Sequence, residues 1–517
     1  MGGTIMNRKI IAMGLTAVLA LSVTACSGGG QTAGDTSDAG ADSQAQGSAD
    51  NGEVTKLVMT FATWTGAPAD TQAVQDAMNE ITRDSIGIEV ELQITDFASY
   101  NQSMTLALSG GEQIDIASTM GFAYGNAVTQ GYLMDLEEND LLNTYGSGIV
   151  ETMGQDNIDA CRVSGVLYGV PNNRDMAQGR GCAAIATEYL DGIGYEFDHE
   201  ANIVRISLDE LNDIYARLHE AYPDKEVYRP TAGSMQQFSN VDALGGNAFG
   251  VLLNNGAELK VENLFTSDFY KEYCERMYTY NQNGYISQDA ATDTTSVTEL
   301  VKAGTLMSYT TGGKPGIKAQ ESNLCGRDMT ILQTMDDYIS STSVASYPWV
   351  IPITSENPEA AMTYLNELYT NPELANLLAW GIEGVHYKVG DDGLATFADG
   401  VDSSTSGWNH SMGWLMPNQF ITYVWEGNDP NLWEEIQEFN DNAVVSAASG
   451  FTFDTTNVAN EITAVTNAYN EYQASVEFGF VDPETGIAEM NDKLMDAGLQ
   501  KIIDEKQRQL DEWAASK

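Results

Sequence analysis

The sequence predicts a mixed α/β fold with two or more lobes, and three observations support this prediction. The chain has 517 residues, which is about three times the usual length of one domain. Residues 56–63 and 88–94 carry β-branched and aromatic side chains at strand lengths, and the polar segment 68–84 between them is typical of a surface helix. Long helical patterns over residues 458–472 and 489–513 close the chain.

Further elements follow in chain order. After Tyr100 the pattern predicts a helix that ends at Gly110-Gly111, and residues 114–118 predict a short strand behind it. Residues 166–171 predict a strand that leaves one lobe. These segments extend the β-α-β pattern of the first hundred residues.

Capping residues mark the starts of three more helices. Ser207 and Glu210 form a capping box. Asn357 and Asn371 each precede a proline and a glutamate, which suit the first turn of a helix, and the second of these helices ends at Gly381. The helix behind the capping box has an apolar face built from Leu211, Ile214, Tyr215 and Leu218.

The net charge excludes some classes of partner. The chain has 74 Asp and Glu residues against 24 Lys and Arg residues, a formal net charge of −50. A chain this acidic repels nucleic acid and anionic lipid. Charged residues are nevertheless only 19% of the chain and hydrophobic residues are 43%, which is the composition of a folded protein. We therefore expect a folded body with an acidic coat and no nucleic-acid partner.

The N-terminal segment predicts export. Residues 7–9 are cationic or polar, and residues 10–23 form an apolar run of signal-peptide length that is too short for a comfortable membrane span. Residues 23–26 (VTAC) resemble a bacterial lipobox, in which the cysteine is lipidated and becomes the mature N-terminus. The sequence therefore predicts a lipoprotein signal peptide at residues 1–25 and lipidation of Cys26.

A polar leash follows this cysteine. Residues 27–52 contain only Gly, Ser, Ala, Asp, Thr, Gln and Asn, so they have no side chains that build a core. We interpret residues 26–53 as the lipidated cysteine with a flexible acidic tether. A lipid anchor with such a tether holds a soluble body at the extracellular face of the cytoplasmic membrane, as in a Gram-positive type of bacterium.

The remaining four cysteines fit no zinc signature. An extracellular location permits disulfides, and four cysteines allow three pairings. We prefer buried free thiols, and the sequence leaves the pairing open for Cys161, Cys182, Cys274 and Cys325.

The chain lacks the common catalytic signatures. It contains no Gly-x-Ser-x-Gly elbow and no Ser-x-x-Lys pair, and His199-Glu200 has no second histidine at the zincin spacing. Asp391-Asp392-Gly393 lacks the alternating ligands of a calcium loop. We therefore predict a protein that is not an enzyme and needs no metal or cofactor. A lipid-anchored glycoside hydrolase stays open as an alternative, because a carboxylate pair has no specificity in so acidic a sequence.

Aromatic residues in polar loops indicate a sugar site. Trp64 directly follows the first predicted strand, where an α/β lobe presents its strand ends to a ligand. Pyranose rings pack their C–H faces on aromatic rings, and their hydroxyls pair with Asp, Asn, Arg and Glu. The candidate ligand-binding residues are Trp64, Asp115, Phe122, Tyr124, Asn172, Asn173, Arg174, Asp175, Trp349, Trp408 and Trp414. Thr119 and Lys314 join them through the resemblance described next.

Several motifs resemble a known family. The lipobox, the loop with Trp64, the segment 165–171 (GVLYGVP) and the turn 314–316 (KPG) resemble lipid-anchored solute-binding proteins of bacterial ABC importers, of the oligosaccharide-binding family 1 type. A more specific likeness, to LipO-type lipoproteins with an extra C-terminal region, rests on the segments 381–387 (GIEGVHY), 416–418 (MPN), 450–454 (GFTFD) and 506–510 (KQRQL).

The resemblance implies a two-lobed periplasmic-binding-protein-like fold of type II, like that of maltose-binding protein, with a hinge, an interlobe cleft and a helical C-terminal extension. It places lobe 1 at residues 54–170 and about 343–381, and lobe 2 at residues 171–342 and about 382–517. It also implies that residues after the crossing proline, and after the first and third strands, face the ligand.

The sequence thus predicts the substrate-binding lipoprotein of an ABC importer. We expect a monomer that captures an oligosaccharide and delivers it to a membrane permease, with the lipid anchor as its only membrane contact. Binding of a peptide or another polar solute stays open as an alternative. The sugar, its linkage and the permease are not readable from the residues.

Overall fold

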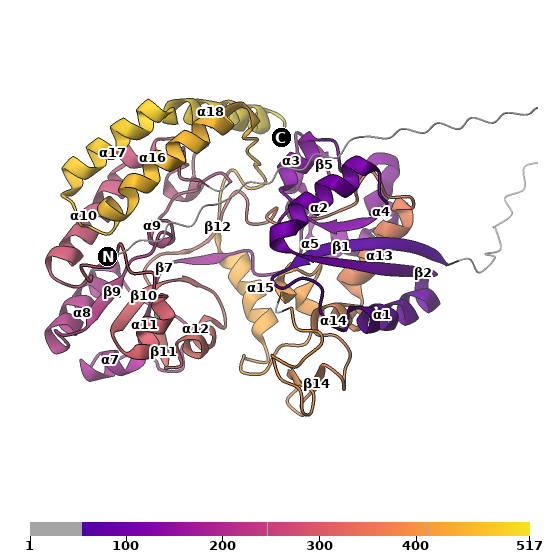
Figure 1. The fold of residues 1–517 in the computed structure, drawn as a ribbon, viewed down its shortest axis with the longest axis horizontal. Coiled ribbons are helices and arrows are strands. Elements are labelled where there is room, and N and C mark those ends of the chain that lie inside the picture. Colours follow the sequence, from indigo (N-terminus) through magenta and orange to yellow (C-terminus); the bar gives the residue numbers. More distant parts are fainter. Residues whose placement is uncertain (1–53, 246, 411) are drawn as a thin grey trace, which may run out of the picture. The chain divides into compact units, whose positions relative to one another are not determined.

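The computed structural model describes residues 54–517 except positions 246 and 411. Two sheets, each with its own hydrophobic core, divide this part of the chain (Figure 1). The predicted signal peptide, Cys26 and the tether lie outside the described residues.

The first sheet has the strand order β2-β1-β3-β13-β6. β1 pairs in parallel with β2 and β3, whereas β13 runs antiparallel to β3 and β6. The strands predicted at residues 56–63 and 88–94 are confirmed. The bounds are β1 (Thr55–Thr63), β2 (Ile88–Asp96), β3 (Ile116–Ser118), β6 (Gly169–Val170) and β13 (Trp349–Val350).

Four longer helices surround this sheet. Gly87 ends the first of them in the left-handed region, at φ 71°. Asn371 caps the last, because its side-chain oxygen accepts from the amides of Glu373 and Leu374. Asn357 makes no capping hydrogen bond through its side chain, so the helix that begins at Pro358 starts with a proline and Glu359 in its first turn but without an asparagine cap. The bounds are α1 (Thr71–Ile86), α2 (Phe97–Gly110), α13 (Pro358–Thr370) and α14 (Pro372–Trp380).

The second sheet is built around β7, which pairs antiparallel with β10, β11 and β12. β7 is buried along most of its length, and alanines occupy several of its positions because helices cover the sheet closely. The bounds are β7 (Gln178–Ala186), β8 (Val204–Arg205), β9 (Glu226–Arg229), β10 (Leu306–Gly313), β11 (Met329–Gln333), β12 (Asp337–Ile339) and β16 (Val444–Val445).

The helices of the second lobe pack on this sheet. Ser207 accepts from the amide of Glu210 at 3.1 Å, as the capping box predicts, and the predicted apolar face of the following helix is buried. The bounds are α7 (Thr187–Gly192), α8 (Leu208–Ala221), α9 (Ser234–Gln237), α10 (Asp268–Gln282), α11 (Val297–Ala303) and α12 (Ile317–Cys325).

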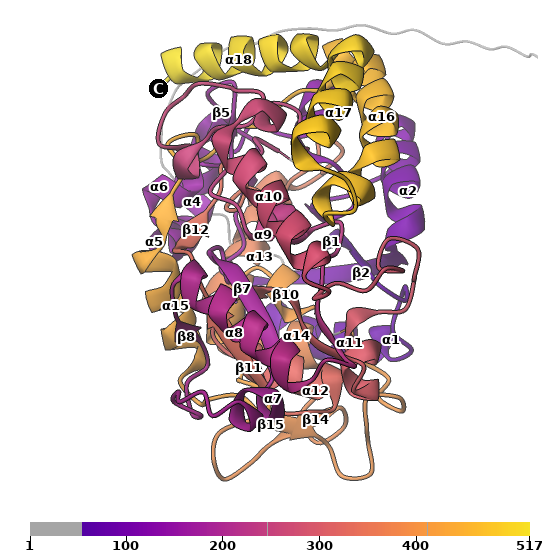
Figure 2. The same ribbon diagram turned by 90° about the vertical axis from the view of Figure 1, so that its left-hand side faces the viewer.

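Three helices form the C-terminal region and join the core of the second lobe. Figure 2 shows them beside α10. Gly498, at φ 112°, separates the last two, so the pattern predicted as one helix over residues 489–513 is broken there. The bounds are α16 (Ala459–Glu477), α17 (Pro483–Ala497) and α18 (Leu499–Ala515).

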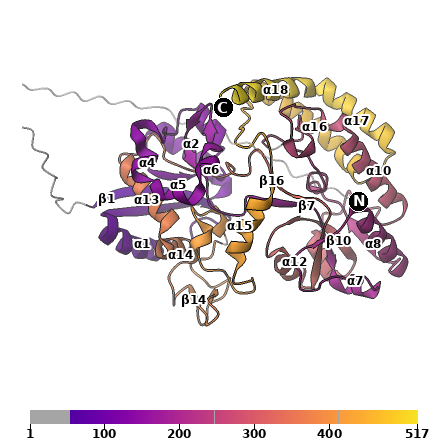
Figure 3. The same ribbon diagram turned by 180° about the vertical axis from the view of Figure 1, so that it is seen from behind.

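The chain passes between the two sheets at three places. β6 leads into β7, and β12 leads into β13. We expected the third crossing after Gly381, but residues 408–416 contribute Trp408 and Met412 to the core of the first lobe. The chain reaches the second sheet only at β16, after α15 (Leu432–Asn442), as Figure 3 shows.

Shorter elements complete the fold. The predicted strand at residues 166–171 is split into β5 and β6. The remaining bounds are α3 (Tyr124–Thr129), α4 (Leu141–Tyr145), α5 (Ser147–Met153), α6 (Gln155–Asp159), β4 (Arg162–Val163), β5 (Val166–Leu167), β14 (Tyr387–Val389) and β15 (Ala395–Phe397).

The four cysteines of the two lobes are buried and unpaired. Burial raises the pKa of the Cys182 thiol to about 12, and it also raises the pKa of the other three. Among the residues that the structure describes, no helix has both the length and the apolar character needed to cross a membrane.

A buried carboxyl lies between α16 and α10. Glu477 accepts hydrogen bonds from the hydroxyls of Tyr469, at 2.7 Å, and Tyr270, at 3.0 Å. Burial raises the pKa of Glu477 from its ordinary 4.5 to about 7, although these hydrogen bonds favour the charged form. The folded chain therefore holds this proton more tightly than the unfolded chain does.

This difference predicts a loss of stability as the pH rises from 4.5 to 7, amounting to about 3 kcal/mol from this group. Glu477→Gln should flatten the pH dependence of the free energy of unfolding in that window, measured by urea denaturation. Glu471→Gln, at an exposed position of the same helix, is the control. A slope that Glu477→Gln leaves unchanged would contradict the prediction.

Candidate functional site

The carboxyl ends of three strands of the first sheet meet at one edge. β1 and β3 are parallel, and β13 places Trp349 opposite both Ser118 of β3 and Val170 of β6. The loops that follow β1, β3 and β6 therefore start at the same side of the sheet. The segment that precedes β13 lies there too, between the loops after β3 and β6. Ligands of open α/β sheets bind outside such carboxyl ends.

Trp64 is the exposed aromatic residue of this edge. It follows β1, and 63% of its surface is exposed. One side is supported by Phe97, with ring centroids 4.6 Å apart and planes tilted by 58°. The hydroxyl of Thr63 donates to the carbonyl of Gly66 at 2.6 Å and so closes the loop. The arrangement holds an indole ring toward solvent, where a flat apolar face of a ligand can stack.

A second group of side chains gathers behind β6 and before β13. The Arg174 guanidinium lies 5.4 Å from the ring centroid of Tyr347, whose ring is 5.6 Å from that of Trp414. One carboxylate oxygen of Asp175 forms an ion pair with the Lys314 ammonium at 3.0 Å, and the other oxygen lies 3.7 Å from the Arg174 guanidinium. All five side chains are partly exposed.

The Lys314–Asp175 pair connects the two lobes. Lys314 directly follows β10 of the second sheet, while Asp175 lies on the crossing between β6 and β7. Arg174 fixes the same crossing to the next one, because its Nη2 donates to the carbonyl of Ser343 at 3.0 Å. A ligand hydroxyl that enters this network meets two cations and a carboxylate.

Two buried polar atoms of this region lack a protein partner. Asn172 donates through Nδ2 to the carbonyl of Trp414 at 2.9 Å, but its Oδ1 has no partner. The Nε of Arg174 is also without one. Buried polar groups are normally hydrogen-bonded. The region therefore retains one acceptor and one donor that a water or a ligand hydroxyl would satisfy.

Asp115 has a structural role in this state, which differs from the expected pairing with a ligand. It lies at the amino end of β3, away from the edge described above, and is fully buried. Its carboxylate accepts from the amide of Val58, at 2.8 Å, and from the hydroxyl of Ser355, at 2.7 Å. These bonds tie β1 to the chain that follows β13.

Two of the expected tryptophans are core residues here. Trp349 and Trp408 are buried, and their indole nitrogens donate to the carbonyls of Leu415, at 3.0 Å, and Leu378, at 3.2 Å. Direct contact of either ring with a ligand would require it to leave the core of the first lobe. Trp64, by contrast, is exposed.

The other expected residues are buried at or near the edge. Thr119 donates both its amide and its hydroxyl to the carbonyl of Pro348. Asn173 donates to Asn418 at 3.1 Å. Phe122 and Tyr124 pack in a small core beneath the loop after β3. These four side chains support the edge, and their contact with a ligand stays a prediction.

Two residues of the site have a role that the sequence pattern did not indicate. The backbone carbonyl of Ser343 accepts a hydrogen bond from the Arg174 guanidinium, and a backbone contact of this kind leaves no side-chain pattern in the sequence. Asn440 of α15 accepts from the amides of Met176 and Ala177, both at 2.9 Å, and so braces the first crossing. An asparagine near the end of a polar helix otherwise indicates only a solvated face.

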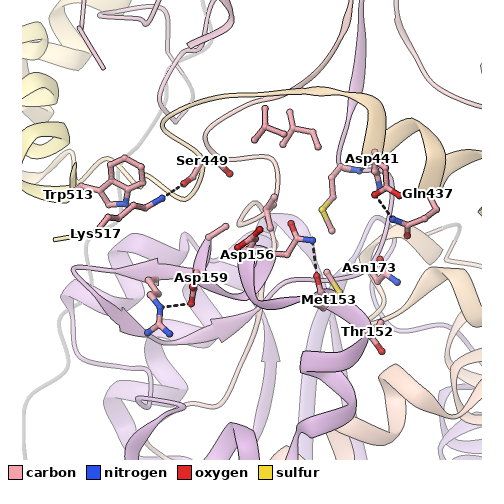
Figure 4. Close-up of a pocket in the computed structure, with 18 of the residues that line it drawn as sticks. Thr152, Met153, Asp156, Asp159, Asn173, Gln437, Asp441, Ser449, Trp513 and Lys517 are labelled. Atoms are coloured by element: carbon pink, nitrogen blue, oxygen red, sulfur yellow. Dashed lines mark hydrogen bonds and ion pairs between the residues drawn. The ribbon is translucent and has the colours of Figure 1, made fainter. Parts of the chain in front are cut away.

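The cavity of Figure 4 lies elsewhere, among α5, α6, α15 and the end of α18. Its volume is about 820 Å³, and Asn173 is the only expected ligand residue that lines it. Some of its polar groups pair within the protein: Asp159 with Arg162, at 2.8 Å, and Lys517 with the carbonyl of Ser449, at 3.1 Å. Because the exposed Trp64 and the group around Arg174 lie at the strand edge, we favour that edge as the ligand site.

No metal centre is evident in the described part of the chain, where no three His, Cys, Asp or Glu side chains converge to hold an ion.

The residues of the strand edge suit a polar solute. Trp64 can stack on the solute, Arg174 and Lys314 can donate hydrogen bonds to it, and Asp175, which is paired with Lys314, can accept them.

Comparison with known proteins identifies similar substrate-binding proteins. A carbohydrate ABC transporter substrate-binding protein of Streptococcus pneumoniae is 27% identical over 452 residues, which cover 85% of this chain and 87% of the relative. An N-glycan transport solute-binding protein (NgtS) of the same species has a solved structure that matches with a TM-score of 0.74 and 25% identity, over 89% of this chain and 98% of that one.

More distant solved structures share the architecture. An extracellular solute-binding protein of family 1 from Alicyclobacillus acidocaldarius matches with a TM-score of 0.54 and 14% identity, over 86% of this chain and 99% of that one. The chain has the two-lobed α/β fold of these solute-binding proteins. This confirms the predicted fold class. A family model described as a domain of unknown function, DUF3502, matches residues 447–515.

The different burial of two tryptophans can be tested through stability. Trp349→Ala should lower the free energy of unfolding by about 3–5 kcal/mol, because it opens a cavity in the core and leaves a carbonyl unpaired. Trp64→Ala should change it by less than about 1 kcal/mol. Urea denaturation measures both, and equal losses would contradict the assignment of Trp349 to the core and Trp64 to the surface.

Proposed function

We propose that this protein is the substrate-binding component of an ABC importer and captures a carbohydrate, specifically an oligosaccharide, at the strand edge of the first lobe. The observation that carries the proposal is the match, over nearly the whole of the two lobes, to substrate-binding proteins named for carbohydrate and N-glycan transport. The N-glycan transport protein was also solved in complex with Man5GlcNAc.

The side chains of the edge suit this ligand class. Trp64 offers an exposed ring for the C–H face of a sugar, and Arg174 and Lys314 offer donors for its hydroxyls. Lys314 belongs to the second lobe, so a sugar bound to both sides holds the lobes together. The ligand thereby favours the closed arrangement through contacts that the open arrangement lacks.

We place the mature protein at the extracellular face of the cytoplasmic membrane, held by a lipid on Cys26 and by the tether of residues 26–53. The support is the lipobox-like sequence and the polar composition behind it. In this proposal the protein is a monomer of the LipO-type subgroup, and its loaded form delivers the oligosaccharide to the permease subunits without chemical change.

The environments of two candidate carboxylates, Asp175 and Asp115, also support capture without chemistry. A glycosidase needs two carboxyl groups about 5–10 Å apart across the scissile bond. At this edge Asp175 is held by Lys314, and Asp115 is buried at the opposite end of β3. Neither is free to serve as a nucleophile or a general acid, which supports a binding protein that is not an enzyme.

Isothermal titration calorimetry tests the proposal directly. The panel contains Man5GlcNAc, other oligosaccharides and short peptides, and each mixture is analysed for products in parallel. We expect saturable heat with an oligosaccharide and no product. Steady release of shorter sugars would instead identify a glycoside hydrolase, and heat with peptides alone would identify a peptide-binding protein.

Substitution of the exposed ring tests the site itself. Trp64→Ala should weaken binding of the oligosaccharide that gives heat by about tenfold, because a stacking surface worth about 1–1.5 kcal/mol is lost. Leu106→Ala is the matched control, since Leu106 is equally exposed, at 63%, but lies on α2. A dissociation constant unchanged by Trp64→Ala would remove this residue from the site.

A further inference from the structure

A fully buried lysine stands out in the C-terminal region. Lys506 belongs to α18, and its ammonium donates to the carbonyls of Ala243, at 3.0 Å, Asn247, at 3.2 Å, and Gly250, at 2.9 Å. The side-chain oxygen of Asn247 is a fourth acceptor, at 3.2 Å. An ammonium is costly to bury, so these four oxygen atoms of Ala243, Asn247 and Gly250 offset the loss of its hydration.

The charge of this lysine is not neutralised by a direct ion pair. Within the described residues no carboxylate lies within 4.0 Å of its nitrogen. Burial lowers the pKa of Lys506 to about 7, and the nearby Asp242 carboxylate favours its charged form. The carbonyl oxygens are therefore its principal partners, and they belong to one short loop.

The same loop is fixed to the second crossing between the lobes. Asp242 pairs its backbone with Leu252 in both directions, at 2.8 and 2.9 Å. Its buried carboxylate accepts from the amide and the hydroxyl of Ser341, both at 2.7 Å, and from the hydroxyl of Tyr338 at 3.0 Å. Ser341 lies directly after β12, where the chain leaves the second sheet for the first.

The C-terminal region also holds this crossing from its other side. Gly450 donates its amide to the carbonyl of Ser341 at 2.9 Å. At φ 87° it also lies against the first lobe, since a Cβ at this position would come within 2.7 Å of the Cα of Ala160. Ser341 is thus held by Asp242 through its amide and hydroxyl and by Gly450 through its carbonyl.

We propose that residues 447–515, the region matched by the domain of unknown function, clamp the hinge, and that Lys506 is the positioning residue of this clamp. By fixing Asp242 against Ser341 it sets how readily the second crossing bends, and thereby the affinity for the oligosaccharide. The affinity part of this inference rests on the proposed function, whereas the bending part does not.

Hydrogen exchange of the full-length protein, followed by mass spectrometry, tests the clamp. Lys506→Met removes the charge at nearly constant volume. We expect the amides of residues 340–346 to exchange about tenfold faster or more, because Asp242 is no longer held against Ser341. Lys501→Met is the matched control, as Lys501 lies on the same helix, is exposed and pairs with Glu461.

The result that would overturn the clamp is faster exchange confined to residues 243–250 and α18, with residues 340–346 unchanged. A lysine that only stabilises its own helix would give that result. The affinity for Man5GlcNAc, or for whichever oligosaccharide gives heat, should change about three-fold or more in Lys506→Met and stay unchanged in Lys501→Met.

Ser341→Ala keeps the proposal falsifiable if Lys506→Met does not fold. It removes one donor to Asp242 and leaves the lysine site intact. Residues 340–346 should again exchange faster, and unchanged exchange contradicts the clamp. Faster exchange without any saccharide binding would uphold the clamp and refute the proposed function. Saccharide binding with unchanged exchange in both variants would refute the clamp alone.

Discussion

The parallel alignment of β1, β3 and β6 is the constraint on which the site depends. Because the three strands end at one edge, Trp64 and the segment 172–175 lie at the same side of the sheet although they are more than a hundred residues apart in sequence. β13 runs antiparallel between β3 and β6, so Tyr347, which precedes β13, lies at the same edge. The shared position of Trp64 and Arg174 at one edge follows from this strand order, whereas Lys314 comes from the end of β10 in the second sheet.

Polar contacts hold the crossings between the lobes, together with buried apolar residues such as Met176 and Val344. Arg174 joins the first crossing to the second, and Lys314 reaches across from the second lobe to Asp175. Hydrogen bonds and ion pairs of this kind have defined geometry, whereas apolar packing alone would allow the segments to slide. The C-terminal helices add buried polar groups to the same end, with Lys506 holding the loop that carries Asp242. The two lobes are thus joined by crossing segments whose hydrogen bonds and ion pairs restrict their conformations.

The parts of the fold that depend on local sequence were predictable. The strands near residues 56–63 and 88–94 and the capped helix after Ser207 follow from periodicity and capping chemistry, which act over a few residues. The break at Gly498 was missed because apolar spacing continues through it. The third crossing was misplaced because the burial of Trp408 depends on packing against segments far away in sequence.

The candidate site shows the same division. Trp64 was proposed from its place after a strand, and the structure shows that it is exposed; its contact with a ligand stays a prediction. Asp115 and Trp349 have the same residue types as ligand contacts, and only the tertiary structure shows that their polar atoms already bond within the protein. Lys506 entered the sequence analysis only as part of the segment 506–510, and its burial was not foreseen, because a lysine in a helix rich in charged residues indicates a solvated face.

A crystal structure of the protein with a bound oligosaccharide that gives heat in calorimetry is the most direct test of the central claim. The account predicts a sugar ring stacked on Trp64, with hydroxyls within hydrogen-bond distance of Arg174 or Lys314 and the two lobes in contact with the same ligand. An oligosaccharide bound in the cavity beside Trp513, with Trp64 free in solvent, would contradict it.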